Sequence, residues 1–289
     1  MSRRPLAGLR PLAASLIATA AAACVPHTPR PTDKLFPTSP MVIGHRGAAG
    51  LAPENTDAAF KVAADLGVAF ELDVTLSADG VPVVIHDDSL DRTTNGAGYV
   101  DEALWANIAE LDAGVFLDAK WEGQRVPRLE DVLRTYTPKV VVNIEIKSPR
   151  DDKPPWEVAR KVVAAIDAAG ARDRVIVTSF NPYVLSACRE YAPDVRRGQL
   201  YSRFKGADLK FYEKWVLRNL MLNSKAVPDL LVAEAEMLRP RYVAKMKDRG
   251  YRIIAWTVND PDEMKRVVAM GVDGIITDRP DMAIQVLAR

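Results

Sequence analysis

The stretch MVIGHRGAAG, residues 41–50, is apolar as far as Gly44 and becomes polar from His45 onward. A buried parallel strand looks like this where it leaves the core of an α/β protein and enters a loop. We therefore expect His45 and Arg46 at the mouth of whatever this strand builds. An imidazole that can carry a proton, next to a guanidinium that can bind an anion, suits chemistry on a phosphate ester.

A second stretch places two carboxylates on one face of a strand. In VAFELDVT, residues 68–75, Glu71 and Asp73 alternate with apolar side chains, and residues two positions apart share a strand face. Two such carboxylates repel each other unless a positive group separates them. A divalent cation is the natural partner, and the all-oxygen character favours Mg²⁺ or Ca²⁺ over zinc.

The chain then reverses direction before PVVIHDD, residues 82–88. The connection is too short for a parallel crossover, and the Asp-Gly pair at 79–80 is a turn signal, so we expect a tight antiparallel hairpin. With the turn at this pair, or one residue earlier, His86 lies opposite Asp73 or Glu71. A second histidine is thereby predicted beside the carboxylates.

A third strand is predicted in KVVVNIEIKSP, residues 139–149, where polar and apolar residues alternate at the end. Glu145 would complete a three-carboxylate oxygen site. Lys147, on the same face, would point toward an anion held there.

Six short motifs, in this order along the chain, resemble the glycerophosphodiester phosphodiesterase family. The similarity extends over roughly residues 41–285. Together the motifs are far more specific than any one of them. They are HRG at 45–47, PENT at 53–56, ELD at 71–73, HD at 86–87, EIK at 145–147 and AWTVN at 255–259.

The resemblance implies metal-dependent hydrolysis of glycerophosphodiesters to an alcohol and sn-glycerol 3-phosphate. His45 and His86 would be the acid and the base, in an order that the sequence leaves open. The nucleophile is either water or the neighbouring glycerol hydroxyl, which would give a cyclic phosphate that is then opened. The implied metal ligands are Glu71, Asp73 and Glu145, and the implied substrate-binding residues are Arg46, Lys147, Trp256 and Glu54.

The fold implied by the resemblance is an irregular (β/α)8 TIM-type barrel of the phosphatidylinositol phospholipase C type, with a small insertion after the third strand. Alternating strands and helices along the chain favour the same α/β class. We expect one barrel domain over 41–289, with the insertion at about 93–125. A helical excursion is predicted at 205–226, and either segment could determine substrate choice.

The N-terminus is expected to be an export segment, residues 1–23, with an arginine-rich start and a short apolar stretch. Cys24 follows small residues and suits lipidation, although ordinary cleavage nearby is an alternative. Residues 24–40 are rich in proline and are interpreted as a poorly packed tether. The protein is thus expected in a bacterial periplasm or cell envelope, with membrane contact only through a lipid anchor.

The composition gives no support for a nucleic-acid partner, because a net charge of +1 provides no basic field.

Two rival functions remain beside the phosphodiesterase. One rival is a phospholipase similar to sphingomyelinase D acting on choline lipids, but the sequence shows no obvious apolar rim for a long lipid. The other is a non-catalytic lipoprotein that binds glycerophosphodiesters, which would not need two histidines. Cys188 is expected to be a buried apolar group, without a structural disulfide.

Overall fold

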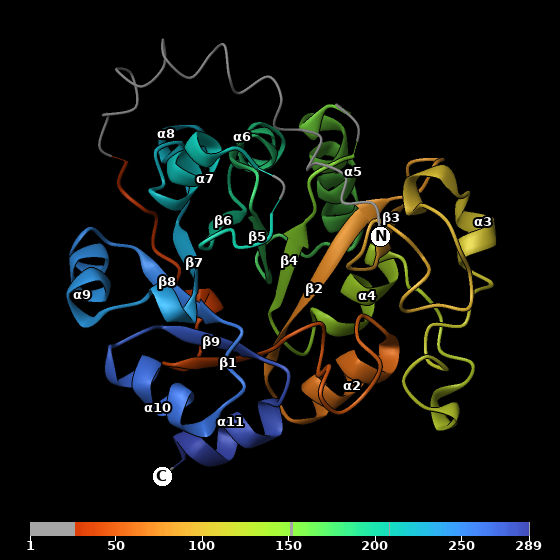
Figure 1. The fold of residues 1–289 in the computed structure, drawn as a ribbon, viewed down its shortest axis with the longest axis horizontal. Helices are drawn as coiled ribbons and strands as arrows, with labels where there is room; N and C mark the ends of the chain where they lie inside the picture. Colours follow the sequence, from red (N-terminus) through yellow and green to blue (C-terminus); the bar gives the residue numbers. More distant parts are fainter. Residues whose placement is uncertain (1–26, 151–152, 208, 289) are drawn as a thin grey trace.

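The structure is a computed structural model that describes residues 27–150, 153–207 and 209–288. Eight parallel strands form a closed barrel, because β1 pairs with both β9 and β2. The predicted TIM-type barrel is confirmed (Figure 1). In barrel order the strands are β1 (Met41–Gly44), β9 (Gly274–Thr277), β8 (Arg252–Trp256), β7 (Leu230–Glu234), β6 (Arg196–Tyr201), β5 (Val175–Ser179), β4 (Val142–Ile146) and β2 (Ala69–Leu76).

Helices connect the strands and cover the barrel (Figure 1). Several begin with proline in the first turn, where a missing N–H costs nothing, and Asn181 and Asp260 cap two of these through their side chains. The helices are α2 (Asp57–Asp65), α3 (Trp105–Ile108), α4 (Leu129–Tyr136), α5 (Pro155–Ala168), α6 (Pro182–Tyr191), α7 (Phe211–Arg218), α8 (Asn223–Ala226), α9 (Pro240–Asp248), α10 (Pro261–Ala269) and α11 (Pro280–Leu287). Short 3-10 turns are η1 (Asp33–Leu35), η2 (Val100–Glu102), η3 (Ala119–Trp121) and η4 (Ala235–Met237).

The extra strand β3 (Pro82–Val84) pairs antiparallel with β2, which confirms the predicted hairpin. The predicted register is wrong by one residue, because the turn contains three residues: Ser77 N donates to Val81 O. Ile85, not His86, therefore lies opposite Asp73, whose carbonyl accepts from the Ile85 N–H. The ladder of β3 ends at Val84, so His86 belongs to the following loop.

The barrel interior is apolar at the amino-terminal ends of the strands and polar at the carboxyl ends. Ala69 and Val141 belong to a buried apolar cluster inside the barrel. Glu71, Asp73 and Glu145 follow them at two-residue spacing, so they continue the same inward face. This arrangement places the acidic residues at the end of the barrel where TIM-barrel active sites form.

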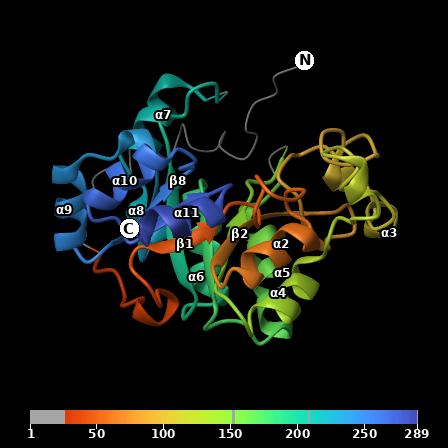
Figure 2. The ribbon, with the colours of Figure 1, turned by 90° about the horizontal axis from the view of Figure 1, so that it is seen from below.

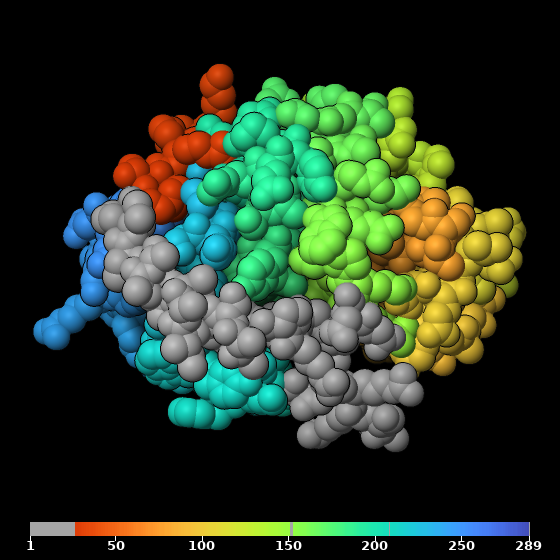
Figure 3. All heavy atoms as spheres, turned by 90° about the horizontal axis from the view of Figure 1, so that it is seen from above, coloured from red at the N-terminus to blue at the C-terminus, as the bar shows by residue number. Residues whose placement is uncertain are grey.

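The segment predicted as an insertion, 93–125, lies between β3 and α4 and contains η2, α3 and η3. It packs onto β3 in a small buried apolar cluster, in which Val100 and Ile108 of the segment lie with Val83 of β3. In the space-filling view this segment forms one flank of the molecule (Figure 3). The predicted helical excursion at 205–226 contains α7 and α8.

Residues 27–40 pack against the barrel, so their interpretation as a poorly packed tether is wrong. Leu35 and Phe36 are buried in the apolar cluster at the amino-terminal ends of the strands. Arg30 donates to the fully buried Asp229 through Nε at 2.9 Å and Nη2 at 2.6 Å. The prediction rested on the proline content, but the burial of Leu35 and Phe36 holds the segment against the barrel. Figure 2 shows this segment, in red, at the end of the molecule opposite α7.

Candidate active site

Two glycines fold the loop after β1 back onto β2. A Cβ on Gly44 would lie 1.7 Å from the carbonyl oxygen of Gly47, and Gly47 itself has a φ of +87° with the Ala59 backbone only 2.6 Å from a Cβ position. The loop is then fixed to Glu71, because the Arg46 N–H donates to its Oε2 at 2.8 Å and the Gly47 N–H to its carbonyl at 3.0 Å. The HRG sequence thus positions Arg46 beside the carboxylates.

Glu71, Asp73 and Glu145 form the predicted cluster, since each offers an oxygen within 4.8 Å of the others. Register explains the proximity, because Asp73 pairs directly with Glu145 on the neighbouring strand. Burial, together with the charges of Asp73 and Glu145, raises the pKa of Glu71 to about 8. A hard divalent cation would relieve this repulsion, and the all-oxygen ligand set fits Mg²⁺ or Ca²⁺.

Lys147 lies among these acids. Its Nζ is 2.9 Å from Asp73 Oδ1 and 2.9 Å from Glu145 Oε1. Burial alone would lower the pKa of Lys147, but the two carboxylates raise it above its ordinary value. Asn55 donates its Nδ2 to the other oxygen of Asp73 at 2.9 Å. Burial would raise the pKa of Asp73, yet Lys147 and the other cations nearby hold it below its usual range.

His45 is oriented by a carboxylate at the end of β9. Its Nδ1 lies 2.6 Å from Asp278 Oδ1, and Asn259 Nδ2 donates to the other oxygen of Asp278. The Asp278 N–H in turn donates to Asn259 Oδ1 at 2.8 Å. Burial would lower the pKa of His45, but the hydrogen bond with Asp278 and the charge of Glu71 raise it overall. The Nε2 of His45 is thereby left for other partners.

His86 has an equivalent arrangement on the other side of the site. Its Nδ1 lies 2.6 Å from Asp87 Oδ1, and Asp87 Oδ2 accepts from Arg92 Nε at 2.6 Å. The hydrogen bonds from His86 and Arg92 lower the pKa of Asp87. Arg92 also donates twice to Glu54, at 2.8 and 2.9 Å, and Glu54 accepts from Arg46 Nη1 at 2.7 Å. Glu54 therefore joins the two arginines.

Trp256 lies at the end of β8 and lines the barrel interior together with His45, Glu71 and Glu145. Its Nε1 donates to the carbonyl of Val232 at 3.2 Å. The indole contacts Phe180 edge to face, with ring centroids 5.6 Å apart. Trp256 thus forms a wall of the site.

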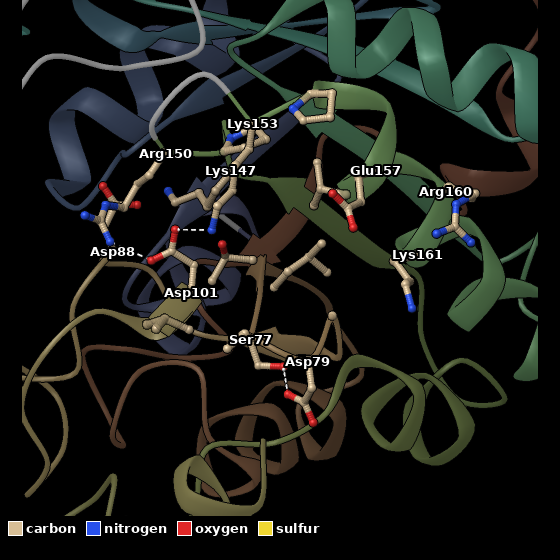
Figure 4. A pocket seen from close by; sticks show the side chains of 18 residues that line it. Ser77, Asp79, Asp88, Asp101, Lys147, Arg150, Lys153, Glu157, Arg160 and Lys161 are labelled. Carbon is tan, nitrogen blue, oxygen red and sulfur yellow. Dashed lines mark hydrogen bonds and ion pairs between the residues drawn. The ribbon is translucent and has the colours of Figure 1, made fainter. Parts of the chain in front are cut away.

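A cleft of about 470 Å³ opens at this end of the barrel, lined by His86, Glu145 and Lys147 at one part and by apolar residues farther along. A second cavity, of about 380 Å³, adjoins the site through Lys147 and Asp88 (Figure 4). Some of its charged groups pair with one another, for example Lys153 Nζ with Asp101 at 2.8 Å. The first cleft is the better candidate for the substrate, because His86, which can carry a proton, and Lys147, which can bind an anion, both line it.

The structure brings together all the predicted catalytic, substrate-binding and metal-binding residues, while Cys24 and the export segment lie outside the described residues. Sequence reasoning missed Asp278 and Arg92, and it did not predict that Asp87 orients His86. The Asp next to His86 in the HD motif was a signal for one of these partners. No sequence signal pointed to Asp278, because it is 233 positions from His45 along the chain.

A sequence profile of the glycerophosphoryl diester phosphodiesterase family matches residues 45–282. The chain belongs to this family. It is 38% identical to the glycerophosphodiester phosphodiesterase of Caldanaerobacter subterraneus subsp. tengcongensis, over 86% of this chain and 98% of that protein.

Solved structures of the family have the same fold. The crystal structure of a Silicibacter pomeroyi protein of this family has a TM-score of 0.74 at 30% identity, covering 87% of this chain and 94% of its own. An Oleispira antarctica phosphodiesterase, solved with the product sn-glycerol-3-phosphate, has a TM-score of 0.76 at 27% identity and covers 87% of this chain and 98% of its own.

Proposed function

We propose that this protein hydrolyses glycerophosphodiesters to an alcohol and sn-glycerol 3-phosphate. The observation that carries the proposal is the grouping of Glu71, Asp73 and Glu145 with Lys147, between two histidines that each hold a carboxylate on Nδ1. Family membership and the product in the Oleispira antarctica structure support the same substrate class.

The three carboxylates would hold one divalent cation, Ca²⁺ or Mg²⁺. When bound, such an ion neutralises a phosphate oxygen and makes phosphorus easier to attack. Arg46 and Lys147 supply further positive charge around the same point, which stabilises the charge that develops in the transition state. The half-buried Lys147 remains cationic, because Asp73 and Glu145 raise its pKa.

The two histidines would divide the proton transfers. One accepts a proton from the attacking hydroxyl, and the other donates a proton to the departing alcohol. Asp278 and Asp87 fix the ring orientations and direct each Nε2 away from its carboxylate partner. Neither carboxylate needs to change protonation state, since the hydrogen bonds lower the pKa of Asp87, and His45 holds the pKa of Asp278 low despite its burial.

The experiment that tests this function measures release of glycerol 3-phosphate from glycerophosphocholine by the purified full chain. We expect release with Mg²⁺ or Ca²⁺ and none in excess chelator. Full activity in chelator would remove the metal from the scheme. His86→Ala should abolish turnover while metal binding, followed by calorimetry, persists. Unchanged hydrolysis by this variant would refute its catalytic role.

We also propose export to the cell envelope with lipidation at Cys24, on the sequence pattern alone. A lipid chain on this cysteine would attach the protein to a membrane. In a bacterial host, the wild-type protein should fractionate with membranes and Cys24→Ala should be released into the soluble fraction. Identical fractionation of both would contradict the anchor.

A further inference from the structure

The amide of Asn143 is a buried polar group that no step of the proposed hydrolysis uses. Asn143 lies on β4, two positions before Glu145, and is only 2% exposed. Neither its Oδ1 nor its Nδ2 has a hydrogen-bond partner among the residues that the structure describes. Burying an amide without a partner costs free energy, so buried polar groups are normally satisfied by protein, by water or by a ligand. The Asn143 amide therefore indicates a water molecule or a ligand beside it.

The neighbours of Asn143 show on which side that partner lies. Asn143 and Glu145 share the inward face of β4, with Asn143 one step deeper in the barrel. Its register partners on the adjacent strands are Glu71 of β2 and Ile176 of β5. Ile176 and Val141 belong to the apolar cluster at the amino-terminal ends of the strands, and their side chains offer no hydrogen-bonding group. The polar surroundings of the amide thus lie toward the carboxylates.

A small cavity adjoins both the amide and the carboxylates. Its volume is about 20 Å³, and Asn143, Glu71 and Glu145 line it together. This is room for about one water molecule. Glu71 and Glu145 each offer an oxygen within 4.8 Å of the other and of Asp73, as the candidate cation site requires. The amide therefore faces the same small space as two of the proposed metal ligands.

We propose that Asn143 is a fourth protein group of the cation site, and that its Oδ1 holds one water molecule of the ion's hydration shell. The inference rests on the divalent cation of the proposed function and adds a residue to its site. Mg²⁺ usually keeps several of its waters, and Ca²⁺ takes about six to eight oxygen ligands that include water. A water whose oxygen faces a cation can only donate, and an amide oxygen accepts such a hydrogen bond.

The test measures the binding of Mg²⁺ and of Ca²⁺ to the purified full chain by titration calorimetry. Asn143→Leu replaces the amide with an apolar side chain that branches at the same carbon. The variant should bind the ion that the wild type binds about 10- to 100-fold more weakly, which is the usual effect of removing a hydrogen-bonding group behind a metal site. Calorimetry reports this loss without any contribution from turnover.

Thermal unfolding in excess chelator gives a second readout. In the metal-free protein the amide is buried without a partner, which costs free energy, and an apolar replacement removes this cost. Metal-free Asn143→Leu should therefore melt no lower than the metal-free wild type. At one fixed ion concentration the wild type should gain more melting temperature than the variant, because it binds the ion more tightly.

A matched control is available in Gln199, which is also a buried amide. Gln199 is 4% exposed, and its Oε1 has no hydrogen-bond partner in the described part of the chain. It does not line the cavity beside the carboxylates. Its Nε2 donates to the carbonyl of Ser179 at 3.1 Å, so Gln199→Met should lose stability but keep the wild-type affinity for the ion. If Asn143→Leu does not fold, Asn143→Ala should show the same loss of affinity.

The remaining outcomes separate this inference from the proposed function. An Asn143→Leu protein that binds the ion as tightly as the wild type would overturn the inference and leave the function standing. Equal weakening in Gln199→Met would also overturn it, since the loss would then follow from a loosened barrel. So would a clearly lower melting temperature of metal-free Asn143→Leu, because the amide would then have a partner without the ion. A wild type that binds neither ion would overturn the cation of the proposed function itself.

Discussion

Replacing Asp278 with Asn should lower kcat/KM on glycerophosphocholine by about 10- to 150-fold. The Asp278 carboxylate lies 2.6 Å from His45 Nδ1, and a hydrogen bond to a charged group contributes about 1.5–3 kcal/mol. Since 1.36 kcal/mol of activation free energy is about a factor of ten in rate, losing this interaction gives the stated range. The amide keeps the shape of the side chain but removes the charge that stabilises a protonated His45.

The same substitution should also shift the pH dependence. Burial alone lowers the pKa of His45, and the hydrogen bond with Asp278 is the largest influence that raises it. In the variant the pKa of His45 therefore falls, and the limb of the pH–rate profile that His45 governs moves to lower pH. Movement of the acidic limb would identify His45 as the base, and movement of the basic limb would identify it as the acid.

The assay is steady-state release of glycerol 3-phosphate across a pH series at saturating metal. Asp262→Asn is a matched control, because Asp262 also follows a barrel strand but its side chain is 91% exposed. It should leave both kcat/KM and the profile unchanged. An Asp278→Asn enzyme with wild-type kcat/KM and an unshifted profile would refute the role of Asp278 in positioning His45.

Three further predictions concern stability and reactivity. Gly47→Ala should lower the unfolding temperature by about 4 °C or more in a thermal melt, because a Cβ would meet the Ala59 backbone at 2.6 Å in a left-handed conformation; an unchanged melt would contradict this. Arg30→Ala should destabilise the fold by about 3 kcal/mol, because it removes a partner from the buried Asp229. Burial would raise the pKa of Asp229, but Arg30 holds it low. The difference between variant and wild type in the free energy of unfolding, measured by urea denaturation, should therefore be full above about pH 4 and shrink as the pH falls. A difference independent of pH would argue against the ion pair. Burial raises the pKa of the Cys188 thiol to about 12, so a thiol reagent should modify it only after unfolding, and rapid reaction in the native state would show that it is accessible.

Much of the site could be predicted because its residues lie at strand ends with readable periodicity. Glu71 and Asp73 share a face by the two-residue repeat of a strand, and Glu145 joins them once the parallel register is set. These relations are local to each strand, so the sequence displays them. The barrel then brings the strand ends together.

What the sequence did not display depends on contacts between distant segments. The partnership of Asp278 with His45 exists only because β9 closes the barrel against β1. The hairpin register depends on whether the turn contains two or three residues, and an Asp-Gly pair does not determine this length. The position of Phe180 next to the excursion at 205–226 could not be predicted either, since Phe180 follows β5 and Leu217 lies in α7, and the two line one cleft only in the folded chain.

The packing of residues 27–40 has a consequence for how an anchored molecule would face its surroundings. His27 Nε2 lies 2.7 Å from the carbonyl of Pro228, just before β7, so the chain enters the barrel at the end remote from the catalytic groups. Cys24 lies three positions before His27, and an extended chain of that length reaches only about 10 Å. A lipid on Cys24 would therefore hold the barrel close to the bilayer with its reactive end turned outward, so that the enzyme would collect substrates from the surrounding solution.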